Sequence, residues 1–280
     1  MTTDSEANPE QAKLWNGPGA RSWIMAQTVL DQAFRGFETL LAEAAVSAGA
    51  RAVLDIGCGT GATTRAIARA LGPGSRTLGL DISAPMIARA TELAGAEGSA
   101  SQFHAGDAQT HAFEPAAFDL IVSRFGVMFF SDPVAAFANL RRAARPGGTL
   151  TMISWRSMTE NRFMTVAERA AAPFLPDLPP RPAGGPGQFA FADQHHVHGI
   201  LEEAGWKDAA SEVLDMPCAF PLSSLDTYLG LMGPVGQMLA KADEALQRQV
   251  IGAIRTAFDD YVEGPDIRFT GACWLTRAEA

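Results

Sequence analysis

Three glycines at alternate positions follow a short apolar run that contains an acid. Residues 53–56 include Asp55, and Gly57, Gly59 and Gly61 come next, ahead of a helical pattern. A strand, a glycine turn and a helix in this order form a nucleotide-binding turn, because glycines adopt positive φ and leave bare backbone for a ligand. The spacing therefore predicts a site for a nucleotide-like cofactor.

Two further acids follow the next predicted strands. Asp81 ends the run 77–80, at about the distance from the glycines at which an acid grips ribose hydroxyls. Ser83 can cap the helix that follows, which leaves Asp81 for the ligand. Asp107 follows the strand 102–105, and the carboxyl ends of parallel strands face one crevice, so we expect it beside an adenine amine. Taken alone, each acid has the simpler alternative of capping a helix or a turn.

These residues require a sheet of strands alternating with helices to position them. Strands are expected at 52–56, 77–80, 102–105, 118–123 and 149–155, and helices at 22–48, 62–71, 83–94 and 134–144, with a turn at 145–148. This alternation predicts an α/β fold with a doubly wound parallel sheet.

The alternation stops after Trp155. Helices are expected at 161–172, 193–204, 222–231 and 237–261, strands at 210–216 and 267–275, and a Pro- and Gly-rich loop at 173–188. We therefore divide the chain into an N-terminal tail and turn (1–21), a cofactor-binding core (22–155), and a helical cap with the last two strands (156–280).

Composition excludes several classes of partner. The 280 residues carry 22 basic and 31 acidic side chains, a formal charge of −9, which disfavours nucleic acid. Three cysteines are not a disulfide framework and fit a reducing compartment. The N-terminus lacks a signal-peptide pattern, and no apolar run reaches membrane-spanning length. We expect a cytoplasmic protein with no membrane partner, and a homodimer is left open.

Ordered motifs give the chain a family resemblance. The motifs are residues 54–61, Leu80 to Ser83 with Met86, residues 106–108, residues 118–123, and Leu140 with residues 145–148. Together they resemble class I S-adenosylmethionine-dependent methyltransferases, in particular bacterial small-molecule enzymes of the ubiquinone-biosynthesis type. The resemblance implies a Rossmann-like sheet of seven strands in the order 3-2-1-4-5-7-6, with the seventh strand antiparallel.

The resemblance also implies which residues bind S-adenosyl-L-methionine. It places Gly57, Gly59 and Gly61 around the methionine part, with Asp55 ordering that turn. The resemblance places Asp81 at the ribose and Ser123 beside the sulfonium. It places Asp107 and Ala108 at the adenine, against which Ile82 and Met86 pack. The implied reaction is direct in-line methyl transfer to a small molecule.

Two other functions use the same glycine turn. Residues 57–62 also fit the G-x-G-x-x-A pattern of a NAD-dependent oxidoreductase. Against that function, Asp55 would lie close to a pyrophosphate, and neither Tyr228 nor Tyr261 has a lysine four residues later. The other alternative is a protein that binds S-adenosylmethionine without catalysis.

The acceptor side is less well defined. The cap is rich in Phe and Met, which suits a hydrophobic or aromatic acceptor, and the loop 173–188 is a hypothetical gate. His111 is a weak candidate for a general base, and Arg124 a weak candidate for an acceptor contact. The histidines at 195, 196 and 198 lack enough further ligands for zinc, so no metal is expected. The catalytic residue stays unknown.

Overall fold

A mixed sheet forms the centre of the molecule. The computed structural model describes residues 7–179, 185–231, 233–239 and 241–280. The sheet order is β3-β2-β1-β4-β5-β8-β6. The strands are β1 Ala52–Ile56, β2 Arg76–Asp81, β3 Gln102–Ala105, β4 Phe118–Arg124, β5 Ala144–Trp155, β6 Lys207–Pro221, β7 Val262–Glu263 and β8 Asp266–Glu279.

The predicted topology is confirmed. Strands β1 to β5 are parallel, β8 is antiparallel to β5, and β6 is antiparallel to β8. Strand β8 is the seventh long strand of the prediction, because the two-residue β7 only pairs with β8. Every residue of β1 is buried, as expected for a central strand covered on both faces.

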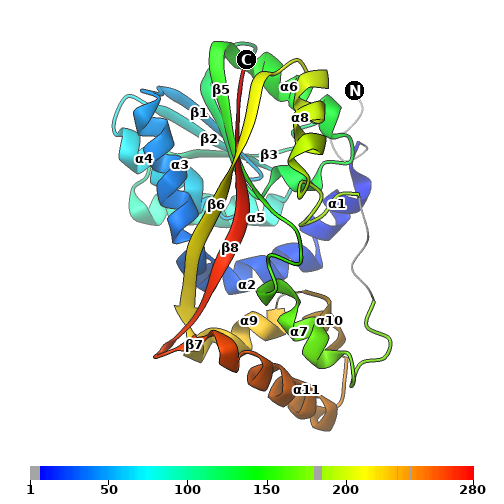
Figure 1. Ribbon diagram of the computed structural model, residues 1–280. Coiled ribbons are helices and arrows are strands. Elements are labelled where there is room, and N and C mark those ends of the chain that lie inside the picture. The colour runs from blue at the N-terminus through cyan, green and yellow to red at the C-terminus, as the bar shows by residue number, and fades with distance from the viewer. Residues whose placement is uncertain (1–6, 180–184, 232, 240) are drawn as a thin grey trace.

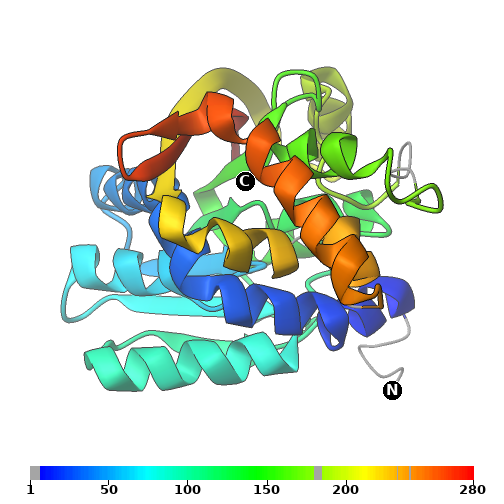
Figure 2. The same ribbon diagram turned by 90° about the horizontal axis from the view of Figure 1, so that it is seen from below.

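Helices cover both faces of the sheet and build a cap at one end (Figure 1). Helix α3 packs on α4, and α6 packs on α8 at the opposite side. In the cap, α9 packs on α2, α10 and α11 pack on α9, and α7 packs on α10 and α11; Figure 2 shows this end of the molecule from below. The helices are α1 Pro9–Trp15, α2 Pro18–Ala33, α3 Arg35–Ser47, α4 Ala62–Leu71, α5 Ala84–Glu97, α6 Pro133–Ala143, α7 Phe163–Ala171, α8 Gln194–Glu203, α9 Leu225–Leu231, α10 Gly233–Leu239 and α11 Glu244–Ala257.

The N-terminal part differs from its prediction. The expected tail contains α1 within its described residues, since Pro9 favours a first helical turn. The expected helix 22–48 is two helices that break at Phe34, whose ring packs against Phe37, Phe125 and Trp155. The break lets α2 run under the cap while α3 stays on the sheet.

Two other elements also differ. The expected turn 145–148 is a bulge inside β5, because Ala144 pairs with Phe118 but Thr149 pairs with Leu120. The expected helix 237–261 is divided into α10 and α11, and Asp243 caps α11 by accepting a hydrogen bond from the Leu246 amide.

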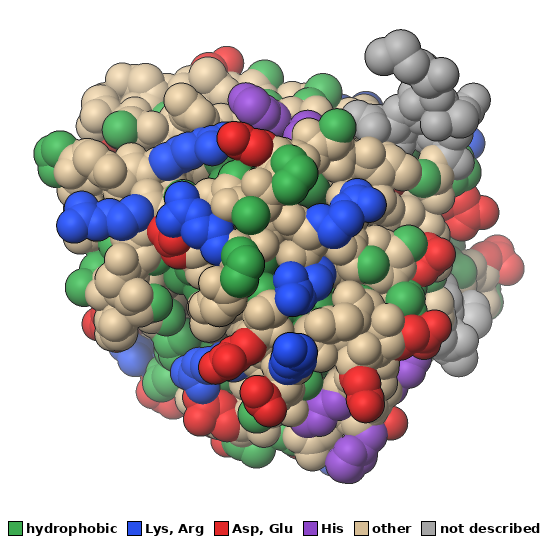
Figure 3. All heavy atoms as spheres, turned by 90° about the horizontal axis from the view of Figure 1, so that it is seen from above, with side chains coloured by type: hydrophobic (Ala, Val, Ile, Leu, Met, Phe, Trp, Pro, Cys, Tyr) green, Lys and Arg blue, Asp and Glu red, His purple; other side chains and the backbone are tan. Residues whose placement is uncertain are grey.

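The end of the molecule opposite the cap carries charges of both signs. Seen from above, Lys and Arg side chains are interspersed with Asp and Glu (Figure 3). No described helix is both long enough and apolar enough to cross a bilayer.

Candidate cofactor and acceptor site

The glycine turn has the geometry that its sequence requires. Gly57, Gly59 and Gly61 have φ values of 63°, 56° and 79°, in the left-handed region. A Cβ on Gly57 would lie 2.4 Å from the Gly126 Cα, and one on Gly61 would lie 2.6 Å from the Phe103 ring. Packing thus excludes side chains at Gly57 and Gly61. A Cβ on Gly59 would have no neighbour closer than 3.6 Å, and the Gly59 backbone is open to the cavity.

Asp55 is buried behind this turn and does not line the cavity. Its side chain is 1 % exposed, and Thr64 donates a hydrogen bond of 2.6 Å to Oδ2. Oδ1 is buried and has no hydrogen-bond partner among the described residues. Burial raises the pKa of Asp55 to about 7, although the Thr64 hydrogen bond and the positive charge of Arg124 oppose the rise.

Asp81 holds the glycine turn as well as lining the cavity. Its Oδ2 accepts from the Gly59 amide at 2.8 Å, and its Oδ1 accepts from the Ser83 amide at 2.9 Å. Ser83 caps α5 as predicted, by accepting from the Met86 amide. Asp81 therefore does not cap α5, but its carboxylate also accepts hydrogen bonds from two backbone amides. Burial raises its pKa.

Some of the candidate site residues line the cavity and others do not. Cavity-lining residues are Gly57, Gly59, Asp81, Ile82, Met86, Asp107, Ala108 and Arg124. Asp107 is 2 % exposed and accepts a hydrogen bond from the Gln109 amide. Asp55, Gly61 and Ser123, which the resemblance implies for the cofactor, are not among the described lining residues, and neither is His111, the candidate general base.

Ser123 is a structural tie within the site. Its Oγ donates to the Ile56 carbonyl at 2.8 Å and accepts from the Gly126 amide at 3.2 Å. Ser123 thereby fixes the loop after β4 against the end of β1, which brings Gly126 onto Gly57.

The cavity has a volume of about 900 Å³ and extends from the glycine turn into the cap. Its cap side is apolar and aromatic. Phe125 stacks on Trp155 with ring centroids 4.1 Å apart, and Trp155 meets Phe163 edge to face at 6.1 Å. Of the predicted cap aromatics, Phe163 and Phe189 line the cavity. Part of the predicted gate, residues 180–184, and Met232 lie outside the described residues.

Sequence patterns gave little indication of the N-terminal wall. Trp15 and Trp23 line the cavity, and their rings meet edge to face at 6.3 Å. Asn16 fixes this wall, since it donates to the Ile82 carbonyl and accepts from the Ala84 amide, both at 3.0 Å. The available signal in the sequence was two tryptophans, one in the predicted tail and turn and one in the predicted helix 22–48.

The other candidate groups are not among the described residues that line the cavity. The His111 ring packs on Phe113 at 4.7 Å, and His198 pairs with Ser211 at 2.9 Å. Within the described residues, no group of three or more His, Cys, Asp or Glu side chains could hold a metal ion. The three cysteines are free, and burial raises the pKa of each thiol.

Comparison with known proteins matches this geometry. Residues 53–148 match the family model of a methyltransferase domain, which spans β1 to the bulge of β5. A demethylmenaquinone methyltransferase of Mycolicibacterium gilvum is 29% identical over 213 residues, covering 72% of this chain and 89% of that protein. The resemblance to class I S-adenosylmethionine-dependent methyltransferases is therefore confirmed. The resemblance to quinone-biosynthesis enzymes is likewise confirmed at the level of sequence relatives.

Three other proteins are also similar to this chain. An uncharacterised protein of Mycobacterium tuberculosis is 33% identical over 145 residues, and this match spans only about half of either chain. Among solved structures, the YcgJ protein of Bacillus subtilis matches with a TM-score of 0.55 at 17% identity, covering 85% of this chain and 97% of that one. The [4+2]-cyclase SpnF matches with 0.54 at 18% identity, covering 93% and 94%. These structures share the methyltransferase fold.

Proposed function

We propose that this protein binds S-adenosyl-L-methionine and transfers its methyl group to a small hydrophobic or aromatic molecule. The observation that carries the proposal is one continuous cavity, lined by a left-handed glycine turn and two strand-end acids and also by the aromatic side chains of the cap. Residues 22–155 would form the cofactor-binding core, and 156–280 the cap and last strands.

Each cavity residue has a role in this proposal. The open backbone at Gly57 and Gly59 lies along the methionine part, and Asp81 accepts hydrogen bonds from the ribose. Asp107 and Ala108 hold the adenine, against which Ile82 and Met86 pack. Asp55, Gly61 and Ser123 order the turn from behind through Thr64, Phe103 and Gly126.

The residues present fit this cofactor better than a dinucleotide. A pyrophosphate needs donors and positive charge, whereas Asp81 and the buried Asp55 surround this glycine turn. S-adenosylmethionine instead brings an ammonium and a sulfonium. Bound here, it would supply an already activated methyl group. The chain's own contribution is to align donor and acceptor away from water, an effect that reaches roughly 7–11 kcal/mol in favourable intramolecular models.

Calorimetry with S-adenosylhomocysteine and with NAD tests the cofactor. We expect S-adenosylhomocysteine to bind and NAD not to. Asp81→Asn should weaken S-adenosylhomocysteine by about tenfold or more, since it removes charge-assisted hydrogen bonds. Asp243→Asn, at the α11 cap, is the matched control and should bind normally. NAD binding in place of S-adenosylhomocysteine would overturn the proposal.

Catalysis needs its own measurement. The fold also occurs in the [4+2]-cyclase SpnF, so cofactor binding does not establish methyl transfer. Transfer of a radiolabelled methyl group to a phenol, a quinone precursor or another extract component supports catalysis. Tight cofactor binding with no labelled product would favour the non-catalytic alternative.

A further inference from the structure

Arg124 lies at the carboxyl end of β4 and lines the cavity. Its Nη1 is buried and has no hydrogen-bond partner among the described residues, and no carboxylate there lies within 4.0 Å of the guanidinium. The guanidinium carbon lies 5.9 Å from the centre of the Phe34 ring. Leaving a buried donor unpaired costs about 1–3 kcal/mol, so a ligand that accepts from it would recover this energy.

The backbone beneath Arg124 is held rigidly. Ser123 ties the preceding position to β1, and Gly126 packs directly on Gly57. Phe125, the next residue, has φ of 66°, which is costly for an aromatic residue. Strain of this kind persists where the surrounding structure requires it, and here it sets the direction in which β4 presents Arg124 to the cavity.

Arg124 also stands apart in charge. The described lining residues include three carboxylates, on Asp81, Asp107 and Glu168, but one cation, Arg124. An anionic group entering the cavity therefore has a single basic partner within the described lining. The neighbouring walls are flat rings, those of Phe34, Phe125 and Trp155, which suit a planar apolar body.

We propose that Arg124 selects the methyl acceptor, which is a planar hydrophobic ring system carrying an anionic oxygen such as a carboxylate or phenolate. The planar guanidinium pairs with that oxygen while the aromatic walls hold the ring. This inference rests on the proposed function, since it describes the acceptor of the same site. The carboxylate of the cofactor has similar chemistry, and the experiment must separate these two sources.

Isothermal titration of the full chain with a matched pair of probes makes the separation. The probes are 2-naphthoate and its neutral isostere 2-naphthamide, each titrated into protein saturated with S-adenosylhomocysteine. Arg124→Gln removes the positive charge. Arg124→Lys keeps the charge but lacks the planar guanidinium that can donate two parallel hydrogen bonds. Arg141→Gln is the matched control, because Arg141 is half-buried on α6 with an unpartnered Nε but does not line the cavity.

The wild-type protein should prefer 2-naphthoate. Arg124→Gln should weaken it by about tenfold or more, the factor of a charge-assisted hydrogen bond, with 2-naphthamide and S-adenosylhomocysteine unchanged within about twofold. Arg124→Lys should lie between, and Arg141→Gln should match wild type. If Arg124→Gln does not fold, the affinities of Arg124→Lys for the two probes are compared with those of the wild type instead.

Four results would overturn the inference. The first is that the wild-type protein shows no preference for the anion, and the second is that neither Arg124 variant has an effect. The third is that both probes lose affinity equally. The fourth is that only S-adenosylhomocysteine loses affinity, which would mean that Arg124 binds the carboxylate of the cofactor. Complete failure to bind S-adenosylhomocysteine would instead refute the proposed function, and the two probes would still report on Arg124 in the unliganded protein.

Discussion

The two sides of the cavity are built in different ways. The cofactor side is formed by the ends of β1, β2 and β3, and its polar atoms are fixed by short hydrogen bonds such as Gly59 to Asp81 at 2.8 Å. The acceptor side is formed by α2, the end of β4 and the cap, and its contacts are ring against ring. One side is positioned by backbone, the other by side-chain packing.

This difference separates what each side tolerates. The left-handed glycine turn tolerates few substitutions, because a Cβ added to Gly57 would overlap the backbone of Gly126. Ring packing tolerates exchange of similar volumes at modest cost. We infer that cofactor binding should be sensitive to single atoms, whereas acceptor binding should vary gradually with side-chain size.

The largest expected effect is at Gly57. Gly57→Ala places a Cβ 2.4 Å from the Gly126 Cα and also requires alanine at φ of 63°. We expect loss of measurable S-adenosylhomocysteine binding by calorimetry and a lower melting temperature. Gly98→Ala is the control, since its φ is 64° but its Cβ would meet nothing within 4 Å. It should cost only about 1 kcal/mol with normal binding, and equal effects of the two variants would contradict backbone contact as the cause.

The next effect concerns pH and Asp55. Its folded pKa of about 7 exceeds the ordinary 3.8, so the fold favours the protonated form. The contribution of Asp55 to the stability of the unliganded protein should therefore be greatest below pH 4, fall as pH rises to 7, and level off above; the gap corresponds to roughly 4 kcal/mol at most.

Asp55→Asn should remove that slope from a series of denaturant titrations. Thr64→Val removes the hydrogen bond that lowers the pKa, and should extend the decline to higher pH. A wild-type slope that survives in Asp55→Asn would assign the pH dependence to other groups.

The same contrast explains what the sequence could predict. The glycine turn, Asp81 and Asp107 follow predicted strands directly, and parallel strand ends meet at one edge, so local order was enough to place them together. The double use of Asp81 was missed, because its bond to the Gly59 amide depends on how closely β1 and β2 approach. The sequence indicated Trp15 and Trp23 only by residue type, because their place in the cavity wall depends on how α1 packs on α2.

A smaller effect is expected on the acceptor side. Phe163→Leu removes the stacking on Phe269 at 3.9 Å and the edge contact with Trp155. Stability should fall by about 1 kcal/mol and 2-naphthoate binding severalfold, with S-adenosylhomocysteine unchanged. Phe113→Leu, outside the cavity, should lower stability without changing 2-naphthoate affinity. Equal loss of both ligands in Phe163→Leu would show that the two sides are not independent.

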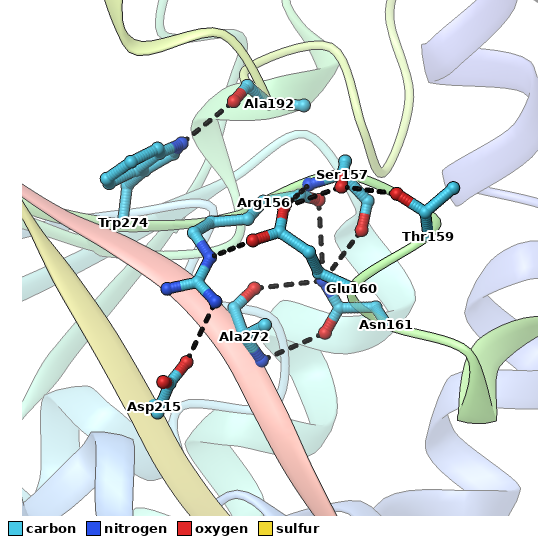
Figure 4. Close-up of polar contacts among 9 residues, drawn as sticks. All are labelled: Arg156, Ser157, Thr159, Glu160, Asn161, Ala192, Asp215, Ala272 and Trp274. Atoms are coloured by element: carbon cyan, nitrogen blue, oxygen red, sulfur yellow. Dashed lines mark hydrogen bonds and ion pairs between the residues drawn. The ribbon is translucent and has the colours of Figure 1, made fainter.

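The smallest effect is expected where the cap joins the sheet. Arg156, directly after β5, pairs with Glu160 and with Asp215 of β6, both at 3.0 Å, and its guanidinium lies over Trp274 (Figure 4). The Arg156 side chain is only 11% exposed, but Asp215 is 54% exposed, so solvent screens the pair. Asp215→Asn should lower the unfolding free energy by about 1 kcal/mol or less.

Salt dependence distinguishes an ion pair at this joint from packing. The loss caused by Asp215→Asn should shrink in 1 M salt, where the Debye length is about 3 Å. Glu212→Gln disrupts the more exposed pair between Glu212 of β6 and Arg277 of β8, and should have a still smaller effect. Neither variant should change S-adenosylhomocysteine affinity, because the cofactor side is fixed by backbone bonds of β1 and β2. Weaker S-adenosylhomocysteine binding in Asp215→Asn alone would mean that the Arg156–Asp215 pair affects the glycine turn.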